Sequence, residues 1–276
     1  MRKYDSRLKN AAYFVYRWIR PFLDPMEFMT AGPRYLLYFR DWFRYSRMEG
    51  AETIKLLDTY PILHEKTQTT SFDSHYFYQD IWAFRKILKS GAASHVDVGS
   101  RIDLVGFLTA ITAVTFIDIR PLMANLDNFT SKKGSILSMP YDDNSVQSLS
   151  CLHVAEHIGL GRYGDPLDPH GTRKGCRELA RILAHGGNLY FALPVGKPRL
   201  CFNGHRIHSP GQILDYLSDL RLVELSGIIQ NSKFIENIDI SILENSDFGC
   251  GLFHFTKSLS VNNACFSESD DGSCHM

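Results

Sequence analysis

The strongest constraint on the fold is a regular alternation of short apolar runs with amphipathic segments after Ser94. HVDVGS and VTFIDIR have the pattern of buried strands, and IDLVGFLTAI between them has that of a helix. The same order returns in SVQSLSCLHV, in a helical segment from Thr172 to Leu183, and in NLYFALPV. Strands that alternate with helices of this length form a parallel sheet covered on both faces. The sequence therefore predicts an α/β fold with a doubly wound, mostly parallel sheet.

This α/β domain is expected to span residues 91–257. A polar, lysine-containing connector and the segment SILSMP are expected between VTFIDIR and SVQSLSCLHV. A helix from Pro210 to Leu217, a strand near Arg221 to Ser226 and a last strand GLFHFT would complete the domain. Residues 258–276 are small and polar, which predicts a disordered tail.

Residues 1–90 are expected to form a helical N-terminal extension or cap. Apolar residues follow a helical spacing around Tyr35 to Tyr45, and a second helix is predicted from Tyr76 to Leu88. Residues 1–47 contain ten Lys or Arg against four Asp or Glu, among many aromatics. This basic aromatic segment could contact a membrane surface peripherally. The alternative is a helical cap whose aromatic side chains pack on the sheet.

The overall composition excludes some classes of partner and location. Thirty basic and thirty acidic residues cancel, so the chain as a whole does not attract nucleic acid. Six cysteines without a C-x-x-C pair favour a reducing compartment over a disulfide framework. No apolar stretch approaches the length of about 20 residues that a membrane span needs. We therefore expect a cytoplasmic protein, with peripheral membrane contact as the open alternative.

The turns after the first two strands are the predicted cofactor site, because ligands of such sheets bind at the carboxyl ends of the strands. Asp97, Gly99, Ser100 and Arg101 follow the first strand, and Asp118 follows the second. Asp118 lies 19 positions beyond Gly99, close to the spacing at which an acid binds a ribose. The alternative is that Gly99 only forms a turn and Asp118 only caps a strand end. The joint spacing favours an adenosine-bearing cofactor.

The loop after the first strand is poorly suited to NAD or FAD. After D-V-G it continues S-R-I-D, without the second and third glycines that a pyrophosphate requires. S-Adenosylmethionine contains no phosphate, so one glycine of close approach and one acid for the ribose could be sufficient. The loop therefore favours S-adenosylmethionine among adenosine-bearing cofactors.

Four longer segments carry a family resemblance: DVGS, FIDIR, MPYDDNSVQSLSCLHVAEHI and RELARILAHGGNLYFALP. With these segments, the chain from about His95 to about Phe255 resembles the class I methyltransferase family. The resemblance implies a methyltransferase-like Rossmann fold, S-adenosylmethionine as cofactor and methyl transfer to a small acceptor. Ser100 and Arg101 replace glycines that normally admit the methionine end of the cofactor. Arg101 could pair with the methionine carboxylate or could block the pocket.

A narrower resemblance covers most of the chain after Thr70. It is carried by HYFYQD, HVDVGSRID, IDIRPL, LHVAEHIGLGRYGDPLDP and FNGHRIHSP. These segments look like a methyltransferase-like family of unknown function, whose members are similar to proteins encoded near surface-polysaccharide biosynthesis genes. The resemblance implies that a carbohydrate-linked molecule is one candidate acceptor.

The pattern H-x-x-E-H at His153, Glu156 and His157 allows three interpretations. A zinc peptidase needs both histidines on one face of a sustained helix, and the glycines that begin at Gly159 leave barely one turn. Alternatively, one histidine is a general base that Glu156 orients. In the third interpretation, all three side chains only stabilise the loop. We predict catalytic roles for these three residues and no metal site.

Arg162, His205 and Arg206 are the predicted contacts to the acceptor. Exposed amides of the glycine-rich loop GLGRYGDPLDPHG, together with Arg162, could receive an anionic group such as a sugar diphosphate. Three functions are thus open: a methyltransferase, a non-catalytic methyltransferase-like binding or scaffold protein in glycan biosynthesis, and a metal-dependent hydrolase. The resemblance favours the first.

Overall fold

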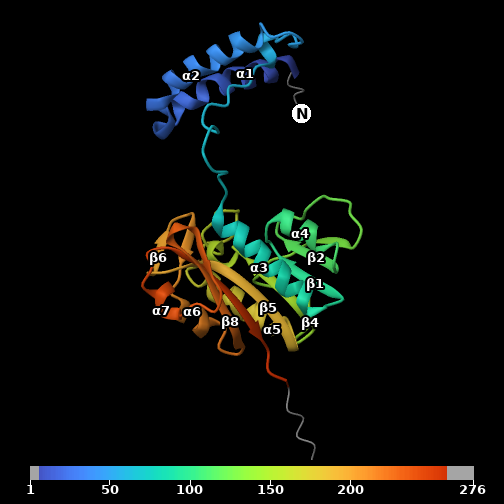
Figure 1. Ribbon diagram of the computed structural model, residues 1–276. Coiled ribbons are helices and arrows are strands. Elements are labelled where there is room, and N and C mark those ends of the chain that lie inside the picture. The colour runs from blue at the N-terminus through green and yellow to red at the C-terminus, as the bar shows by residue number, and fades with distance from the viewer. Residues whose placement is uncertain (1–5, 260–276) are drawn as a thin grey trace, which may run out of the picture. The chain divides into compact units, whose positions relative to one another are not determined.

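The computed structural model describes residues 6–259 and divides into two compact units, Met1–Ser71 and Phe72–Met276 (Figure 1). The first unit contains helices α1 (Ser6–Leu23) and α2 (Pro25–Tyr45) and a short 3-10 helix, η1 (Leu56–Asp58). No helix in residues 6–259 is long and apolar enough to cross a membrane. The predicted disorder of the tail falls, from residue 260 onward, outside the described residues.

The second unit is built on one eight-stranded sheet in the order β3-β2-β1-β4-β5-β10-β8-β9. Strands β1 to β5 pair in parallel, and β10, β8 and β9 add antiparallel pairings. This order confirms the doubly wound, mostly parallel α/β fold. The strands are β1 (Ser94–Val98), β2 (Ala113–Asp118), β3 (Phe129–Lys133), β4 (Val146–Leu152), β5 (Leu183–Val195), β8 (Arg221–Ile229), β9 (Lys233–Ile235) and β10 (Gly249–Thr256).

Helices cover both faces of the sheet (Figure 1). Helices α3 (Ser74–Ser90) and α4 (Ile102–Leu108) pack on one face, and α5 (Gly171–Ile182), α6 (Pro210–Tyr216) and α7 (Ile240–Glu244) pack on the other. Successive side chains of β5 alternate between the two cores: Phe191 lies in the core under α5, and Tyr190 lies in the core under α3. Burial on both sides explains why the Leu189–Val195 part of β5 is continuously apolar.

Strand β3 was not predicted. It occupies the segment taken for a lysine-containing connector, whereas SILSMP forms no strand and contains only an isolated bridge between Ser135 and Ser138. The reason is that β3 is an edge strand, with Lys132 and Lys133 exposed. The hairpin of β6 (Arg199–Cys201) and β7 (His205–Ile207) was also not predicted.

Helix α3 belongs to the second unit, so the two units divide after Ser71 and not after residue 90. Asp73 caps its first turn and accepts hydrogen bonds from the backbone amides of His75 and Tyr76. Gly91 ends the helix in the left-handed conformation, with φ 64°. Buried Trp82 and Ile87 attach α3 to the sheet, which places its N-terminal turn near the carboxyl ends of the strands.

Candidate functional site

The carboxyl ends of β1, β2 and β4 lie side by side. In the register of the sheet, Val98 is opposite Ile117, and Asp97 is opposite Ser150. The residues at the ends of these strands, among them Gly99, Asp118 and His153, therefore line one cavity.

Two adjacent cavities open at this edge. The first has a volume of about 430 Å³, and its walls include Gly99, Asp118, Ile119 and Leu137. The second has a volume of about 410 Å³, and its walls include residues of α3, of β7 and of the short 3-10 helix η2 (Ala155–His157). Residues common to both walls are Gly99, His153, His157 and Tyr163. The two cavities therefore meet at the end of β4.

Gly99 and Asp118 approach each other closely in the first cavity. Gly99 has φ 65°, and a Cβ atom there would lie 3.3 Å from Asp118 Oδ2 and 3.2 Å from Val154 Cγ2. A residue other than glycine would be strained and would narrow the cavity beside the carboxylate. Asp118 Oδ1 accepts a hydrogen bond of 2.6 Å from the Arg120 amide, and the side chain lines the cavity. Both residues line the cavity at the ends of β1 and β2, where the sequence predicts a cofactor site.

Asp97, also predicted to contact the cofactor, lies beneath the loop and stabilises it. It is fully buried, accepts a hydrogen bond of 3.0 Å from the Ser100 amide and accepts another from the Ser150 hydroxyl. His95 lies beside it, with Nε2 2.8 Å from Ser150 Oγ. Burial raises the pKa of Asp97 to about 6. Asp97 therefore positions Gly99 and Ser100 from below.

Arg101 lines the second cavity. Among the described residues that line the first cavity, Arg101 does not occur. Its guanidinium lies over the Tyr76 ring at 5.0 Å, donates a hydrogen bond of 2.9 Å to Asp103 and lies 3.8 Å from Asp80. Ser100 accepts a hydrogen bond from the Leu152 amide and also lines the second cavity. The recess beside Asp118 is therefore not blocked by Arg101.

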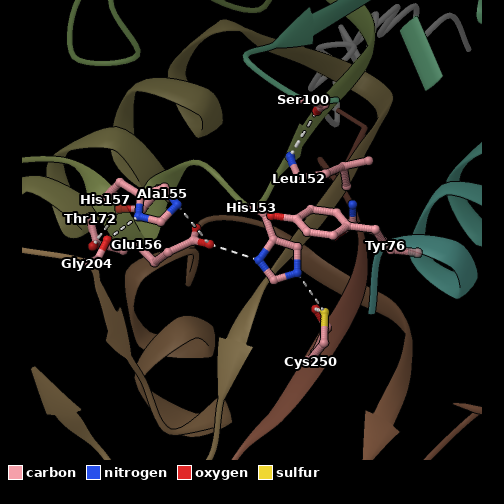
Figure 2. Close-up of polar contacts among 12 residues, drawn as sticks. Tyr76, Ser100, Leu152, His153, Ala155, Glu156, His157, Thr172, Gly204 and Cys250 are labelled. Atoms are coloured by element: carbon pink, nitrogen blue, oxygen red, sulfur yellow. Dashed lines mark hydrogen bonds and ion pairs between the residues drawn. The ribbon is translucent and has the colours of Figure 1, made fainter. Parts of the chain in front are cut away.

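His153 is held by two buried partners. Its Nδ1 lies 2.9 Å from Glu156 Oε1, and its Nε2 lies 3.4 Å from Cys250 Sγ (Figure 2). Burial lowers the pKa of His153, but Cys250 and Glu156 outweigh it and hold this pKa well above its usual value. Burial raises the pKa of Glu156, but His153 and His157 outweigh it, so the net shift is downward. Both shifts favour a charged His153–Glu156 pair, and neither nitrogen of His153 is available as a base.

His157 is arranged differently. Its Nδ1 lies 2.7 Å from the carbonyl oxygen of Gly204, to which it donates (Figure 2). In a neutral ring this donation leaves Nε2 without a proton. Nε2 lies 3.6 Å from Glu156 Oε1, which can stabilise the ring once it gains a proton. His157 is therefore the better candidate for a general base.

The H-x-x-E-H pattern does not lie on a sustained helix. Ala155–His157 form a single 3-10 turn, η2. His153 faces Cys250, whereas His157 faces a backbone carbonyl. In the part of the chain that the structure describes, no group of three or more His, Cys, Asp or Glu side chains could hold a metal ion. The geometry required of a zinc peptidase is not present at these residues.

A carboxylate of the glycine-rich loop accepts hydrogen bonds from the backbone of the same loop. Asp165 accepts hydrogen bonds from the amides of Gly159, at 2.6 Å, and Tyr163, at 3.3 Å. Burial raises the pKa of Asp165, but these hydrogen bonds outweigh it and lower the pKa. Two amides of the loop, those of Gly159 and Tyr163, are thus occupied by a carboxylate of the same loop.

The three predicted acceptor contacts separate into two groups. Arg162 and His205 line the second cavity. Arg206 instead donates hydrogen bonds to the carbonyl oxygens of Ile158, at 2.5 Å, and Asp168, at 2.9 Å, so it holds the loop in place. For Arg206, also predicted to contact the acceptor, both terminal nitrogens of the guanidinium thus donate to backbone oxygens.

Three residues of this region were not predicted: His75, Tyr76 and Cys250. His75 and Tyr76 come from the first turn of α3 and line the second cavity. His75 and Tyr76 belong to the HYFYQD segment, which stands out in the sequence only as part of the family resemblance. Cys250 reaches His153 from β10, 97 positions along the chain, and no local pattern in the sequence indicates this contact.

This chain is similar to one protein-family model and to solved structures. The family model described as "Caenorhabditis protein of unknown function, DUF268" matches residues 127–227. Among curated proteins, none matches the chain significantly. N-methyltransferase NodS from Bradyrhizobium japonicum WM9, solved in complex with S-adenosyl-L-homocysteine, is 14% identical with a TM-score of 0.47, over 79% of this chain and 97% of that chain.

A second solved structure is a sarcosine dimethylglycine methyltransferase homologue from Galdieria sulphuraria. It is 16% identical, with a TM-score of 0.47, over 66% of this chain and 86% of that chain. Similarity at this level concerns the arrangement of the chain and does not extend to the substrate.

Proposed function

We propose that this protein transfers a methyl group from S-adenosylmethionine to a small acceptor. The observation that carries the proposal is the pair of cavities that meet at Gly99, His153, His157 and Tyr163. A two-substrate transfer needs neighbouring sites whose reactive groups come together at a shared wall. The first cavity would hold the cofactor, and the second would hold the acceptor.

The residues of the first cavity fit the cofactor. Asp118 would bind the ribose hydroxyls, and the absence of a side chain at Gly99 leaves room beside that carboxylate. Ile119 and Leu137 supply apolar wall for the adenine. Arg101, at the edge of the second cavity, would bind the methionine carboxylate in exchange for its contact with Asp103. When bound, S-adenosylmethionine supplies a methyl group already activated on a sulfonium.

The chain's own residues orient the acceptor and remove its proton. Methyl transfer to a hydroxyl or amine releases one proton, which His157 Nε2 is placed to accept while Nδ1 keeps its hydrogen bond to Gly204. Glu156, 3.6 Å away, stabilises the resulting positive charge. His153 is a positioning residue, because its pair with Glu156 fixes the turn that carries His157.

The second cavity favours a polar acceptor. His75, Tyr76, Arg162 and His205 contribute donors, acceptors and ring surfaces to its wall. Such a wall suits a molecule rich in hydroxyl groups, and a carbohydrate-linked acceptor is the candidate that we favour. Since Asp165 occupies the amides of Gly159 and Tyr163, Arg162 is the contact that we propose for an anionic group of the acceptor.

Titration calorimetry with S-adenosylmethionine tests the proposal. We expect saturable binding to the parent chain and a loss of at least roughly tenfold in affinity in Asp118→Asn, because the hydrogen bonds involve a charged group. The matched control is Asp142→Asn, an exposed carboxylate in the segment before β4. Absence of binding in the folded parent would contradict the proposal and favour the non-catalytic scaffold. Unchanged affinity in Asp118→Asn would show that the cofactor binds elsewhere.

A further inference from the structure

Helix α2 exposes a continuous apolar stripe. Phe28, Met29, Leu36, Phe39 and Phe43 are 56%, 81%, 73%, 46% and 61% exposed. At 3.6 residues per turn, these side chains project within a sector of about 100°. Large exposed apolar residues concentrated in this way indicate a surface that binds another protein, a membrane or a ligand.

The interior of the same helical pair is already filled. Trp18 of α1 stacks on Tyr35 of α2 at 5.6 Å and contacts Tyr38 edge-on at 5.7 Å. Tyr35 is buried and donates a hydrogen bond to the Trp18 carbonyl. Helix α1 adds more exposed apolar residues: Val15, Ile19 and Leu23. The stripe contacts α1 along one edge, through Phe39 with Trp18 at 5.7 Å and Phe28 with Phe22 at 6.4 Å. Met29, Leu36 and Phe43 stay mostly exposed.

Positive charge borders the stripe. Arg40 and Arg44 are exposed and follow its edge by helical geometry. The guanidinium of Arg47 lies 4.1 Å from the centre of the Phe43 ring, so its stem covers apolar surface while its charge stays at the rim. Asp41 is paired with Arg40 at 2.7 Å, so this pair adds no net charge and the positive charge at the edge rests on Arg44 and Arg47. Residues 1–47 carry ten basic and four acidic side chains.

We infer that α1 and α2 dock the protein on the surface of an anionic lipid bilayer. A helix with a broad apolar stripe and arginines at its edge lies in the plane of the interface, with the apolar side chains among the acyl chains and the arginines at the phosphates. A second copy of this chain is a poorer partner, because it would bring the same basic residues against each other. The inference is independent of the proposed methyl transfer.

Co-sedimentation of the full chain with lipid vesicles tests this inference. We expect binding to vesicles with about one-third phosphatidylserine, weak binding to pure phosphatidylcholine, and loss of binding as salt is raised. Leu36→Ser combined with Phe43→Ser should reduce binding by at least roughly tenfold, because two apolar side chains no longer enter the bilayer. The matched control is Phe107→Ser, a 69% exposed phenylalanine in α4, which should bind like the parent.

A second pair of variants separates the contribution of charge. Arg44→Gln with Arg47→Gln should weaken binding to anionic vesicles several-fold, and Lys132→Gln with Lys233→Gln, which removes two exposed charges from the second unit, should have little effect. Circular dichroism checks that each variant is folded. The inference is overturned if the parent binds neither vesicle or if the Leu36/Phe43 variant binds like the parent. It is also overturned if the parent is a dimer in solution that this variant dissociates.

Discussion

His157 Nδ1 lies 2.7 Å from the carbonyl oxygen of Gly204, so the turn after β4 is tied to the β6–β7 hairpin through an imidazole ring. Only a protonated Nδ1 can donate to a carbonyl, which fixes the tautomer of the neutral ring. The ring then presents an unprotonated Nε2 in a wall shared by the two cavities. This relationship distinguishes His157 from His153, both of whose nitrogens have buried partners.

The first prediction concerns this tautomer. Nitrogen-15 spectra of the parent at pH 8 should show His157 protonated at Nδ1 and unprotonated at Nε2. The resonances are assigned by their loss in His157→Gln, and His170, which lies at the start of α5, serves as the internal reference. A dominant Nε2-protonated form would rule out His157 as the base in the geometry described.

The second prediction concerns the buried pair of His153 and Glu156. Glu156→Gln should destabilise the fold by about 3 kcal/mol, because it leaves a buried imidazole without its charged partner. The pKa of His153, raised by Cys250 and Glu156 against burial, should fall in this variant. Urea unfolding measures the first effect, and a proton titration of His153 measures the second. Glu244→Gln, at an exposed position, should stay within about 0.5 kcal/mol of the parent.

The same pair has a defined pH dependence. The lowered pKa of Glu156 gives stability that is present above its ordinary value of 4.5 and lost as pH falls through the folded pKa. The raised pKa of His153 gives stability that is present below its ordinary value of 6.5 and lost as pH rises through the folded pKa. The difference in unfolding free energy between parent and Glu156→Gln should therefore be largest between pH 4.5 and 6.5. A difference independent of pH would mean that the pair is not charged.

Local patterns predicted the central part of the fold because its strands are short runs of mostly buried residues and its helices end at clear signals. β1, β2, β4 and β5 and helices α3, α5 and α6 lie close to their expected positions. β3 was missed because an edge strand needs little apolar surface, and Lys132 and Lys133 made it look like a connector. Propensity and periodicity describe neighbours in sequence, so they are weakest where a strand has one partner.

The candidate site was predictable to the extent that strand ends alone determine it. Gly99, Asp118 and His153 line a common cavity because each lies at or directly after the end of a parallel strand, and His157 follows in the first turn after β4. The arrangement within the site depends on contacts between distant segments. Cys250 occupies one nitrogen of His153, and Gly204 occupies one nitrogen of His157. These contacts give the two histidines different hydrogen-bond partners, a difference that the H-x-x-E-H pattern does not indicate.

The third prediction concerns buried Asp97 and His95, which share Ser150. Burial raises the pKa of Asp97 from 3.8 to about 6, so its contribution to stability is lost as pH rises through that range. The shift corresponds to about 3 kcal/mol. Burial lowers the pKa of His95 from 6.5 to about 3, so stability is lost as pH falls below 6.5. Between pH 4 and 6, the titrations of Asp97 and His95 therefore change the unfolding free energy in opposite directions.

Asp97→Asn isolates the contribution of His95. The amide can still accept from the Ser100 amide and can donate to Ser150, so the fold should persist. The unfolding free energy of the variant should rise relative to that of the parent as pH rises from 4 to 6, because the variant lacks the titration of Asp97. As pH falls from 6 to 4, the unfolding free energy of the variant should decrease more steeply than that of the parent. Urea unfolding at a series of pH values measures both slopes. Parallel curves for parent and variant would mean that Asp97 does not titrate in this range.

The fourth prediction compares two glycines. Gly99→Ala places a Cβ at φ 65°, 3.3 Å from Asp118 Oδ2 and 3.2 Å from Val154, so it should destabilise the fold by about 1 kcal/mol. It should also remove detectable S-adenosylmethionine binding, because the added methyl lies beside the carboxylate proposed to hold the ribose. Gly106→Ala in α4 is the matched control: it meets open space in a helix and should stabilise the fold by up to about 1 kcal/mol. Thermal unfolding and titration calorimetry measure the two effects. Full cofactor affinity in a folded Gly99→Ala would show that the close approach of β1 and β2 does not form the cofactor site.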